Sequence, residues 1–498
     1  MKNLNRRSFL KSTALSAAAL GWTAKSWSQI PGANGDVRIA VIGFNGRGQN
    51  HIDGYKKITG ARLVALCDVD KKVLDRGVQR LQSGGGEISG YTDIRKLLED
   101  KNVDAVSIAT PNHWHSLAGI WSVQAGKDVY VEKPISHNVW EGRQLVNAAR
   151  KYNKIVQAGT QSRSSIHGIK AAVEWVREGN LGKILVARGL CYKPRASIGK
   201  AGGEQPIPDS VDYDLWCGPA EKVPLTRKKL HYDWHWVWNT GCGDLGNQGI
   251  HQMDIARWFL GETTLAPRVW SVGGRLGYDD DGETPNTQIV YQDYEKAPLI
   301  FEVRGLPKSK EAQGKGWGAK DMDKFPVEHG DSVSVTIHCE NGHIQVPNYL
   351  SAIAYDKDEK EIMRWPKKGE SDKGDDGHYG NFLKAVRSRK TSDLNADILE
   401  GHLSSALCHT SNISYRLGAK KSPGEIREKI KGDKDALPTF ERMVEHLKAN
   451  EVNLDMDKAT LGVVLKMDVK SEKFPGQDEA NALLTRKYRA PFIVPEKV

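Results

Sequence analysis

The first third of the chain alternates short apolar runs with longer amphipathic stretches. Apolar, mostly β-branched residues fill Val37–Ile42, a glycine-containing turn follows, and a second apolar run covers Ala61–Cys67. The alternation continues with a helical pattern over 93–100, a strand over 105–109, a helix over 116–125 and a strand over 128–131. Strands that alternate with helices predict an α/β fold with a parallel, doubly wound sheet.

From residue 159 the pattern changes to shorter strands in which polar residues separate the apolar ones. Such stretches lie at 184–190, 269–272, 287–291, 299–303 and 332–337, with a helical pattern after residue 249. They predict an α+β domain built on a large, mostly antiparallel, open-faced sheet. We therefore expect domains at 36–158 and 159–420. The extension over 421–498 contains a helix at 439–449 and is expected to wrap the body or a neighbouring subunit.

The N-terminus has the features of an export signal. Paired arginines at positions 6 and 7 precede an alanine-rich apolar run over 14–22, and small residues surround Trp27. This order is typical of a twin-arginine signal peptide, so we expect residues 1–28 to be removed near Ser28 and the protein to be periplasmic. No apolar run reaches the roughly 18 residues that a membrane span requires.

Charge and cysteine content argue against several other classes of protein. The formal net charge is +10, of which five positive charges lie within residues 1–28 with no acid among them. The remaining surplus is small, and lysines are interleaved with acids, as over 356–373, so we expect no nucleic-acid partner. The six cysteines have no C-x-x-C spacing, which signals neither a zinc site nor a disulfide framework.

The turn after the first strand has the pattern of a dinucleotide-binding loop. Gly43 and Gly48 occupy the first and third glycine positions of G-x-G-x-x-G, and Asn45 takes the middle one, where it can tolerate the left-handed conformation. Asp68, at the end of the next strand, would bind the ribose hydroxyls and repel a 2′-phosphate. The sequence therefore predicts a Rossmann domain that prefers NAD to NADP. The residues expected at the pyrophosphate are Gly43, Asn45, Gly46, Arg47 and Gly48.

Three further motifs follow strand ends, where a parallel sheet binds its ligand. They are Thr110-Pro-Asn112-His-Trp-His115, Glu132-Lys133-Pro134, and the segment 241–254, which contains Asn247 and His251. Together with the glycine turn, these motifs resemble the Gfo/Idh/MocA family, which includes glucose-fructose oxidoreductase and inositol dehydrogenase. The resemblance covers residues 36–415.

The resemblance implies a role for each of these strand-end residues. Lys133 would bond the reacting hydroxyl and Glu132 the nicotinamide ribose, since oxidation of a secondary alcohol needs a proton acceptor beside the hydroxyl. Thr110, Asn112 and His115 would contact the cofactor. For Asn112, capping of the following helix is an alternative that the residues alone leave open.

The third motif departs from the family pattern at its acid–base pair. The family places an aspartate four residues before a histidine on one helix face, and the matching residues here are Asn247 and His251. An amide cannot exchange a proton, so either His251 acts with Lys133, or Asp244 or Asp254 compensates. Asp254 shares a helix face with His251 and could orient its imidazole. A buried, structural role for His251 is the alternative.

An aromatic cluster precedes this motif. It comprises Trp216, Trp234, His235, Trp236 and Trp238. Aromatic faces bind the C–H faces of sugar rings, but the alternate spacing from 234 to 238 is also that of a strand packing into a core. The cluster therefore favours carbohydrate as the substrate class.

Export and nicotinamide chemistry together suggest a tightly held, recycled NAD, because the periplasm offers no pool of free NAD. We expect an oxidoreductase acting on a sugar, glycoside or polyol by ping-pong exchange. The alternative cycle is that of an NAD-dependent glycosidase, which oxidises C3 transiently and eliminates the aglycone, as in some exported family members. A non-catalytic sugar-binding or cofactor-binding protein is a third hypothesis, because of Asn247. The resemblance also implies a homo-oligomer, either a dimer or a tetramer.

Overall fold

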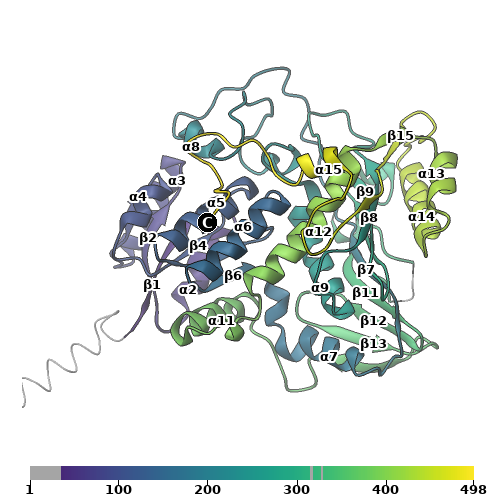
Figure 1. The fold of residues 1–498 in the computed structure, drawn as a ribbon, viewed down its shortest axis with the longest axis horizontal. Coiled ribbons are helices and arrows are strands. Elements are labelled where there is room, and N and C mark those ends of the chain that lie inside the picture. The colour runs from purple at the N-terminus through teal and green to yellow at the C-terminus, as the bar shows by residue number, and fades with distance from the viewer. Residues whose placement is uncertain (1–34, 314–317, 327–328) are drawn as a thin grey trace, which may run out of the picture.

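The structure is a computed structural model that describes residues 35–313, 318–326 and 329–498 (Figure 1). The predicted export signal at residues 1–28 lies outside the described residues. Two sheets stand side by side, each with its own helices, and long connections pass over both (Figure 1). Among the helices of the described ranges, none has the length and apolar character that crossing a bilayer demands.

The N-terminal sheet is parallel and doubly wound, as predicted. Its strands are β1 (Val37–Ile42), β2 (Ala61–Cys67), β3 (Ser89–Tyr91), β4 (Ala105–Ile108), β5 (Asp128–Glu132) and β6 (Val156–Gly159), in the spatial order β3-β2-β1-β4-β5-β6. The helices are α2 (Gly48–Lys56), α3 (Lys71–Ser83), α4 (Ile94–Glu99), α5 (Asn112–Gln124) and α6 (Val139–Lys151). Helix α5 begins at Asn112, four residues before the predicted start, because its first turn is buried as deeply as the rest.

The second sheet is larger and mostly antiparallel, which confirms the predicted fold class. Within the described residues its order is β14-β13-β12-β11-β7-β10-β9-β8-β16-β15, with β17 beside β8, and β7 and β10 form its parallel pair. The strands are β7 (Ile184–Cys191), β8 (Arg268–Gly274), β9 (Thr287–Asp293), β10 (Leu299–Arg304), β11 (Val333–Cys339), β12 (Gly342–Val346), β13 (Ala352–Tyr355), β14 (Glu361–Trp365), β15 (Ala419–Lys421), β16 (Ala459–Leu461) and β17 (Leu465–Lys466).

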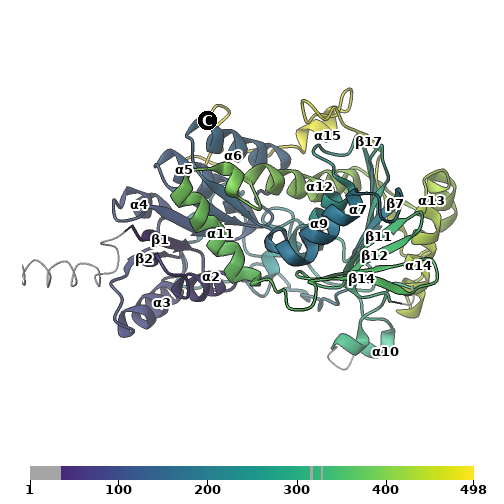
Figure 2. The ribbon, with the colours of Figure 1, turned by 90° about the horizontal axis from the view of Figure 1, so that it is seen from below.

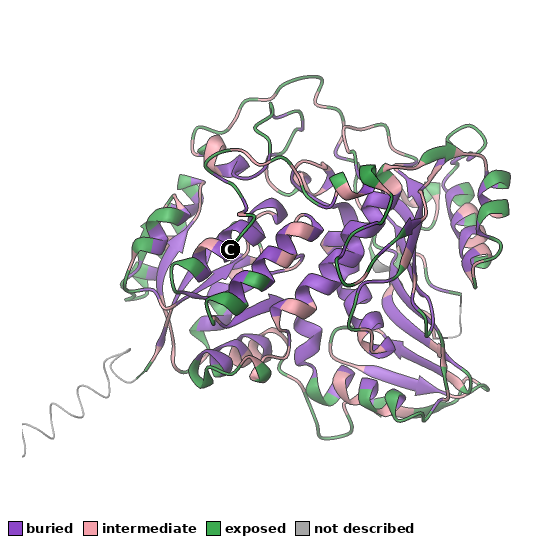
Figure 3. Ribbon diagram, viewed as in Figure 1, coloured by how far each residue is buried: buried purple, intermediate pink, exposed green. Residues whose placement is uncertain are grey.

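Helices cover both faces of this sheet. On one face lie α7 (Ala171–Arg177), α9 (Ile250–Leu260) and α12 (Ile398–Arg416), of which α9 and α12 are buried along most of their length (Figures 2 and 3). On the other face, α13 (Pro423–Ile430) and α14 (Ala436–Ala449) pack against β8 and β9 through an apolar cluster. The C-terminal extension therefore occupies a face that the sequence pattern left open.

The chain also returns to the N-terminal domain after the second sheet is built. Helix α11 (Gly374–Ser388) lies beneath the parallel sheet in Figure 1 and buries Tyr379 and Phe382 against Tyr55 and Tyr130. The last residues, from 483 onward, cross from α15 (Asp478–Ala482) to end beside α5 and α6 (Figures 1 and 2). We call residues 483–498 the C-terminal strap.

Candidate active site

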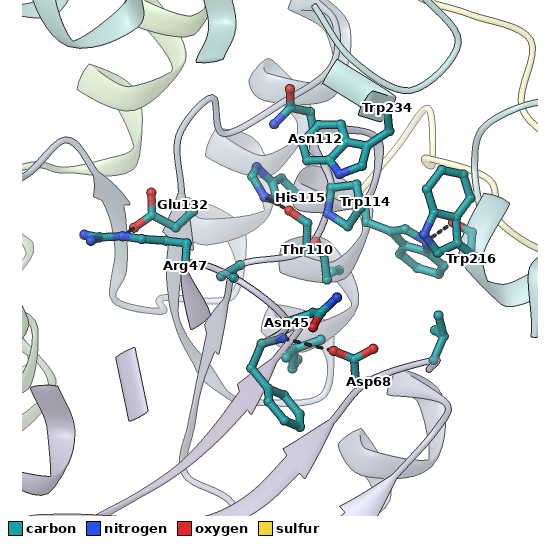
Figure 4. Close-up of a pocket in the computed structure, with 18 of the residues that line it drawn as sticks. Asn45, Arg47, Asp68, Thr110, Asn112, Trp114, His115, Glu132, Trp216 and Trp234 are labelled. Carbon is teal, nitrogen blue, oxygen red and sulfur yellow. Dashed lines mark hydrogen bonds and ion pairs between the residues drawn. The ribbon is translucent and has the colours of Figure 1, made fainter. Parts of the chain in front are cut away.

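A pocket of about 420 Å³ opens at the carboxyl ends of β1, β2, β4 and β5. Most of the predicted cofactor residues line it, together with Asn247 and a segment of the second domain. Figure 4 shows Asn45 and Asp68 at one end and Asn112, His115 and Trp234 at the other. The pocket is therefore elongated, with the glycine turn and Lys133 on its wall.

The glycine turn approaches neighbouring backbone too closely for larger residues. Gly43 has φ of +74°, and a Cβ built on it would lie 2.8 Å from the Cα of Thr110. A Cβ on Gly48 would collide with the carbonyl oxygen of Gly43. Asn45, in contrast, does not adopt the left-handed conformation that asparagine can tolerate. The tight turn is made by Gly43 instead, so the middle position tolerates asparagine.

Helix α2 begins at Gly48, and no side chain caps its first turn. The free N–H groups of such a turn, together with the positive end of the helix dipole, bind anions. Thr110, which faces the turn, has a buried hydroxyl without a protein partner. A close-approach turn, an uncapped helix and an unused hydroxyl fit the pyrophosphate of a dinucleotide.

Asp68 lies beside the turn with both carboxylate oxygens engaged. Its Oδ2 accepts from the backbone N–H of Phe44 at 3.0 Å and its Oδ1 from that of Asp70 at 3.0 Å (Figure 4). Burial raises the pKa of Asp68 against the effect of these two bonds. Each oxygen keeps a lone pair for a ribose hydroxyl, so the geometry fits the role predicted for this residue.

Glu132 is the centre of a buried polar cluster. Its Oε1 lies 3.0 Å from Arg47 Nε, 3.1 Å from His51 Nε2 and 3.0 Å from Gln161 Nε2. Burial alone would raise the pKa of this carboxyl, but the charge of Arg47 and the bond to His51 hold it well below its usual range. Arg47 also pairs with Asp375 at 2.9 Å, at the start of α11. Arg47 therefore joins the glycine turn to both β5 and α11.

Asn112 and His115 occupy the first turn of α5. The N-cap of this helix is Pro111, so the alternative that Asn112 caps it is wrong; its Oδ1 accepts from the thiol of Cys242 at 3.3 Å. His115 places Nδ1 2.5 Å from the carbonyl oxygen of Pro134 and Nε2 2.7 Å from that of Thr110. The His115 ring thus connects the Thr110 loop to the loop that carries Lys133.

Lys133 is one of the residues that line the pocket. Its Nζ donates to the carbonyl oxygen of Asn247, across the boundary between the two domains. Burial lowers the pKa of Lys133, and the charge of Arg47 adds to this effect against that of Glu132. An amine that loses its proton more readily than usual is suited to proton exchange with a substrate hydroxyl.

The side chain of Asn247 donates to Asp244 Oδ1 at 3.2 Å. Asp244 in turn accepts two bonds from Arg195, at 2.9 Å from Nε and 2.8 Å from NH2. The carboxylate of Asp244, itself buried, is thus paired with a partly exposed guanidinium. It is held in place rather than free to act as a base.

His251 does not line the pocket, although the matching family position is catalytic. Its Nδ1 is buried without a partner, its ring lies 4.8 Å from that of Tyr349, and burial together with the Lys133 charge lowers its pKa well below the usual range. Our suggestion that Asp254 orients His251 is wrong. Asp254 is fully buried in ion pairs with Arg163, at 2.8 Å, and Arg257, at 3.6 Å.

The tryptophan cluster divides between pocket and core. Trp216 and Trp234 line the pocket, whereas Trp236 is buried and Trp238 packs near Tyr415. The alternate spacing does not reflect a strand, because residues Asp233–Trp236 form a short 3₁₀ turn. The aromatic platform is therefore smaller than the sequence suggested.

A segment of the second domain, residues 205–238, covers the pocket and is called the cover here. The N–H of Lys71 donates to Ser210 at 2.8 Å, and His231 lies 3.3 Å from Asp70. The indole of Trp114 donates to the carbonyl oxygen of Leu215 at 3.0 Å. Cover and cofactor domain are thus bonded along the Asp68 end of the pocket.

The C-terminal strap fastens the cover from outside. Arg489 donates to Asp214 Oδ1 at 2.9 Å and to Gly218 at 3.1 Å, and Arg486 bonds Asn239. Phe492 packs its ring 5.6 Å from that of Trp114. Sequence patterns gave no signal for these contacts, nor for Tyr232 and Tyr349 near the site, because the contacts join segments far apart in the chain. His235 was identified only as a member of the aromatic cluster.

Two family descriptions match the chain. The NAD-binding Rossmann fold of the GFO_IDH_MocA oxidoreductase family covers residues 37–160, and the family's C-terminal alpha/beta domain covers residues 172–311. The chain belongs to the Gfo/Idh/MocA oxidoreductase family. The resemblance inferred from the glycine turn and the strand-end motifs is confirmed.

Relatives of this Gfo/Idh/MocA chain include proteins named as glycosyl hydrolases. A glycosyl hydrolase family 109 protein of Shewanella pealeana is 31% identical over 176 residues, and a second from Shewanella sp. strain MR-4 is 33% identical over 171 residues. Each match covers 30% of this chain and 38% of the relative.

Solved structures of the same fold include two sugar dehydrogenases. The WlbA dehydrogenase from Bordetella pertussis, in complex with NADH and UDP-GlcNAcA, has a TM-score of 0.53 and 20% identity, and the match covers 75% of this chain and 94% of that one. Levoglucosan dehydrogenase, in complex with NADH and levoglucosan, has a TM-score of 0.55 and 16% identity, with coverage of 75% and 95%. These likenesses concern the fold.

Proposed function

We propose that the chain is an oxidoreductase that uses tightly bound NAD to oxidise a secondary alcohol of a sugar or glycoside. The observation that carries the proposal is a single pocket lined by the glycine turn, Asp68, Lys133 and residues of the bonded cover. Gly43, Gly48, Thr110 and Asp68 would hold the cofactor. When bound, NAD accepts the hydride that the substrate carbon loses.

The chain's own residues would bind and deprotonate the substrate. Lys133 presents an amine of lowered pKa to the pocket, and Trp234 also lines it. Aromatic faces pack against the C–H faces of sugars. The sugar dehydrogenases of the same fold lend support to this substrate class, and Asp68 favours NAD over NADP because a carboxylate repels a 2′-phosphate.

The bonds between cover, strap and cofactor domain favour a cofactor that stays through many turnovers. Such a cofactor must be returned to its starting state within each cycle. The predicted export signal supports the same conclusion, since a periplasmic enzyme would have no free NAD to draw on. We therefore propose that the protein is periplasmic and that it recycles its bound cofactor.

Glycoside cleavage is the second candidate, favoured by the family 109 relatives. In that cycle the C3 hydroxyl is oxidised to a ketone, the acidified C2 proton is removed, and the aglycone leaves with the bonding electron pair. Water then adds to the resulting double bond, and the ketone is reduced again by the hydride first removed. The cycle consumes one water and no net oxidant.

Two measurements on the purified protein test these proposals. Mass spectrometry after denaturation is expected to find about one NAD per chain. A panel of p-nitrophenyl glycosides then distinguishes the cycles: release of nitrophenol without added NAD supports the glycosidase, and a keto-sugar formed only with an added carbonyl acceptor supports ping-pong exchange.

Lys133→Met provides the control, because it removes the amine and keeps the length of the side chain. It is expected to retain NAD and to lose turnover about 100-fold, in the range of lost acid–base catalysis. A protein without bound NAD contradicts the recycled cofactor. Unchanged turnover in the Lys133→Met variant contradicts the assigned site.

A further inference from the structure

His235 lies on the pocket wall, and its tautomer is defined by a backbone contact. Its Nδ1 is within hydrogen-bond distance of the carbonyl oxygen of Tyr232. A carbonyl oxygen only accepts, so Nδ1 carries the ring proton and donates it. In the neutral ring the lone pair then resides on Nε2. Within the part of the chain that the structure describes, this nitrogen has no hydrogen-bond partner.

A strained turn holds the ring in this orientation. Tyr232 has φ of +67° and ψ of −51°, and the N–H of Asp233 donates to the carbonyl oxygen of His231 at 2.9 Å, which closes a three-residue γ-turn. A tyrosine in this region is strained, and such strain persists where the surroundings fix the residue. Here Arg195 fixes it by donating to the phenol oxygen at 3.2 Å.

Aromatic neighbours restrict the ring further. Trp234 stacks on His235 with ring centroids 3.6 Å apart and an interplanar angle of 21°, and the Tyr232 ring lies 4.8 Å away. Arg195, which holds Tyr232, is itself anchored on Asp244, the residue that accepts from Asn247. The loop of His235 and the position of Asn247 therefore belong to one bonded network.

Burial keeps this imidazole neutral, and a neighbouring positive charge adds to the effect. Burial and the charge of Lys133 lower the pKa of His235 to about 3, against the bond to the Tyr232 carbonyl. At neutral pH the ring thus presents a lone pair to a pocket that Lys133, a hydrogen-bond donor, also lines. This combination is what a substrate hydroxyl needs, because it must bind by one hydrogen bond and lose a proton through another.

We propose that His235 is a catalytic residue of this pocket, whose Nε2 binds the reacting hydroxyl of the substrate and accepts its proton. The inference rests on the proposed function and assigns the acid–base role to His235 in place of the Asn247 and His251 positions. The carbon loses its hydrogen with two electrons to the nicotinamide, the hydroxyl loses a proton to Nε2, and the C–O bond becomes C=O. Loss of the hydride makes the hydroxyl a far stronger acid, so a weakly basic imidazole suffices.

A substitution pair tests the role in turnover. His235→Asn keeps a donor for the Tyr232 carbonyl but lacks a basic nitrogen, and it is expected to lower kcat on the best nitrophenyl glycoside about 100-fold with bound NAD unchanged. His251→Asn is expected to change kcat less than tenfold, and the exposed His167→Asn serves as the control. A His235→Asn enzyme at the wild-type rate, with wild-type turnover measurable, overturns this inference and leaves the proposed function intact.

Chemical labelling tests the tautomer without any substrate. Diethyl pyrocarbonate acylates an unprotonated, accessible imidazole nitrogen, and at pH 5 the reaction of an ordinary surface histidine is slowed by protonation. We expect peptide mass spectrometry of the NAD-loaded protein to show His235 labelled at pH 5 at least tenfold faster than His115, whose two nitrogens both face carbonyl oxygens. Equal or slower labelling of His235 overturns the inference, whatever the turnover assays give.

Discussion

Asn247 stands where the family has an aspartate, and its neighbours are arranged to bond an amide. Its side-chain amide nitrogen lies 3.2 Å from a carboxylate oxygen of Asp244, and its backbone carbonyl oxygen accepts from Lys133. The residue is thus a donor to one charged group and an acceptor from another. An aspartate at this position would face a carboxylate where an N–H now stands.

We expect Asn247→Asp to weaken the fold and not to improve catalysis. Two carboxylates at this distance repel each other, which should lower the free energy of unfolding by about 1–2 kcal/mol. Urea unfolding and turnover of the same nitrophenyl glycoside measure the two effects. The matched control is Asn247→Ala, which removes the donor to Asp244 without adding a second carboxylate and should therefore cost less stability. A faster and equally stable Asn247→Asp variant would contradict the geometry described here.

At the residue scale, the sequence predicts the roles of residues that belong to a pattern of consecutive positions. A strand, a glycine turn and an aspartate at the next strand end are consecutive features, so Gly43, Gly48 and Asp68 could be placed from them. Asp254 could not, because its partner Arg163 lies 91 residues away. His235 was noticed only as part of an aromatic cluster, since its tautomer depends on a γ-turn that no spacing rule predicts.

At the scale of elements, the cover and the C-terminal strap act as one layer over the pocket. Phe492 fills a position between Trp114 and Trp121, and Arg489 ties the strap to α8 (Tyr213–Cys217). Trp114 also supports Trp216, a wall of the pocket, by donating to its carbonyl oxygen at 3.1 Å. The strap therefore supports the wall without touching the pocket itself.

We expect Phe492→Ala to release the cofactor faster. Loss of a buried aromatic ring destabilises its surroundings by about 3–5 kcal/mol. If about 1.4 kcal/mol of this destabilises the closed position of the cover, the rate of NAD dissociation rises about tenfold. The rate is measured from the decay of bound NADH fluorescence after dilution into excess NAD. Ile493→Ala is the control, because that neighbouring side chain is half exposed. Identical release rates in both variants would exclude a role for the strap.

The pattern of strands and helices predicted both sheets but not what joins them. Hydrophobic periodicity and composition identify a helix or strand from its own residues. The position of α11, in contrast, depends on its packing against Tyr55 and Tyr130 of the other domain. The long extension likewise contained one recognisable helix, and α13 was missed because it spans only eight residues. Helix α13 covers the sheet because β8 and β9 present an apolar face there.

At the scale of the whole molecule, buried ion pairs hold distant segments together. Glu472, in the C-terminal extension, accepts from Arg143 of α6 at 2.5 Å and lies 2.9 Å from His402 of α12. Burial alone would raise the pKa of Glu472, but the bond to His402 and the interaction with Arg143 lower it to about 2. Three segments therefore meet at one carboxylate.

This carboxylate predicts a pH dependence of stability. Because its pKa is lowered on folding, its contribution is fully present above the unfolded value of about 4.5 and is lost as the pH falls towards 2. Glu472→Gln should therefore lower the free energy of unfolding by about 1–3 kcal/mol at pH 7 and by progressively less between pH 4.5 and 2. Urea unfolding at pH 7, 4 and 3 measures the difference. A penalty independent of pH would mean that the charge is not what stabilises this contact.

Helix α11 has a consequence for how the molecule unfolds. It belongs to the later part of the chain, yet Tyr379 and Phe382 complete the core beneath the parallel sheet, against Tyr55 and Tyr130. The cofactor domain cut out on its own would leave that aromatic face in water, where it favours aggregation over solubility. When α11 leaves with the later part of the chain, the core of the cofactor domain is opened, so the stability of that domain depends on a segment that follows the second sheet.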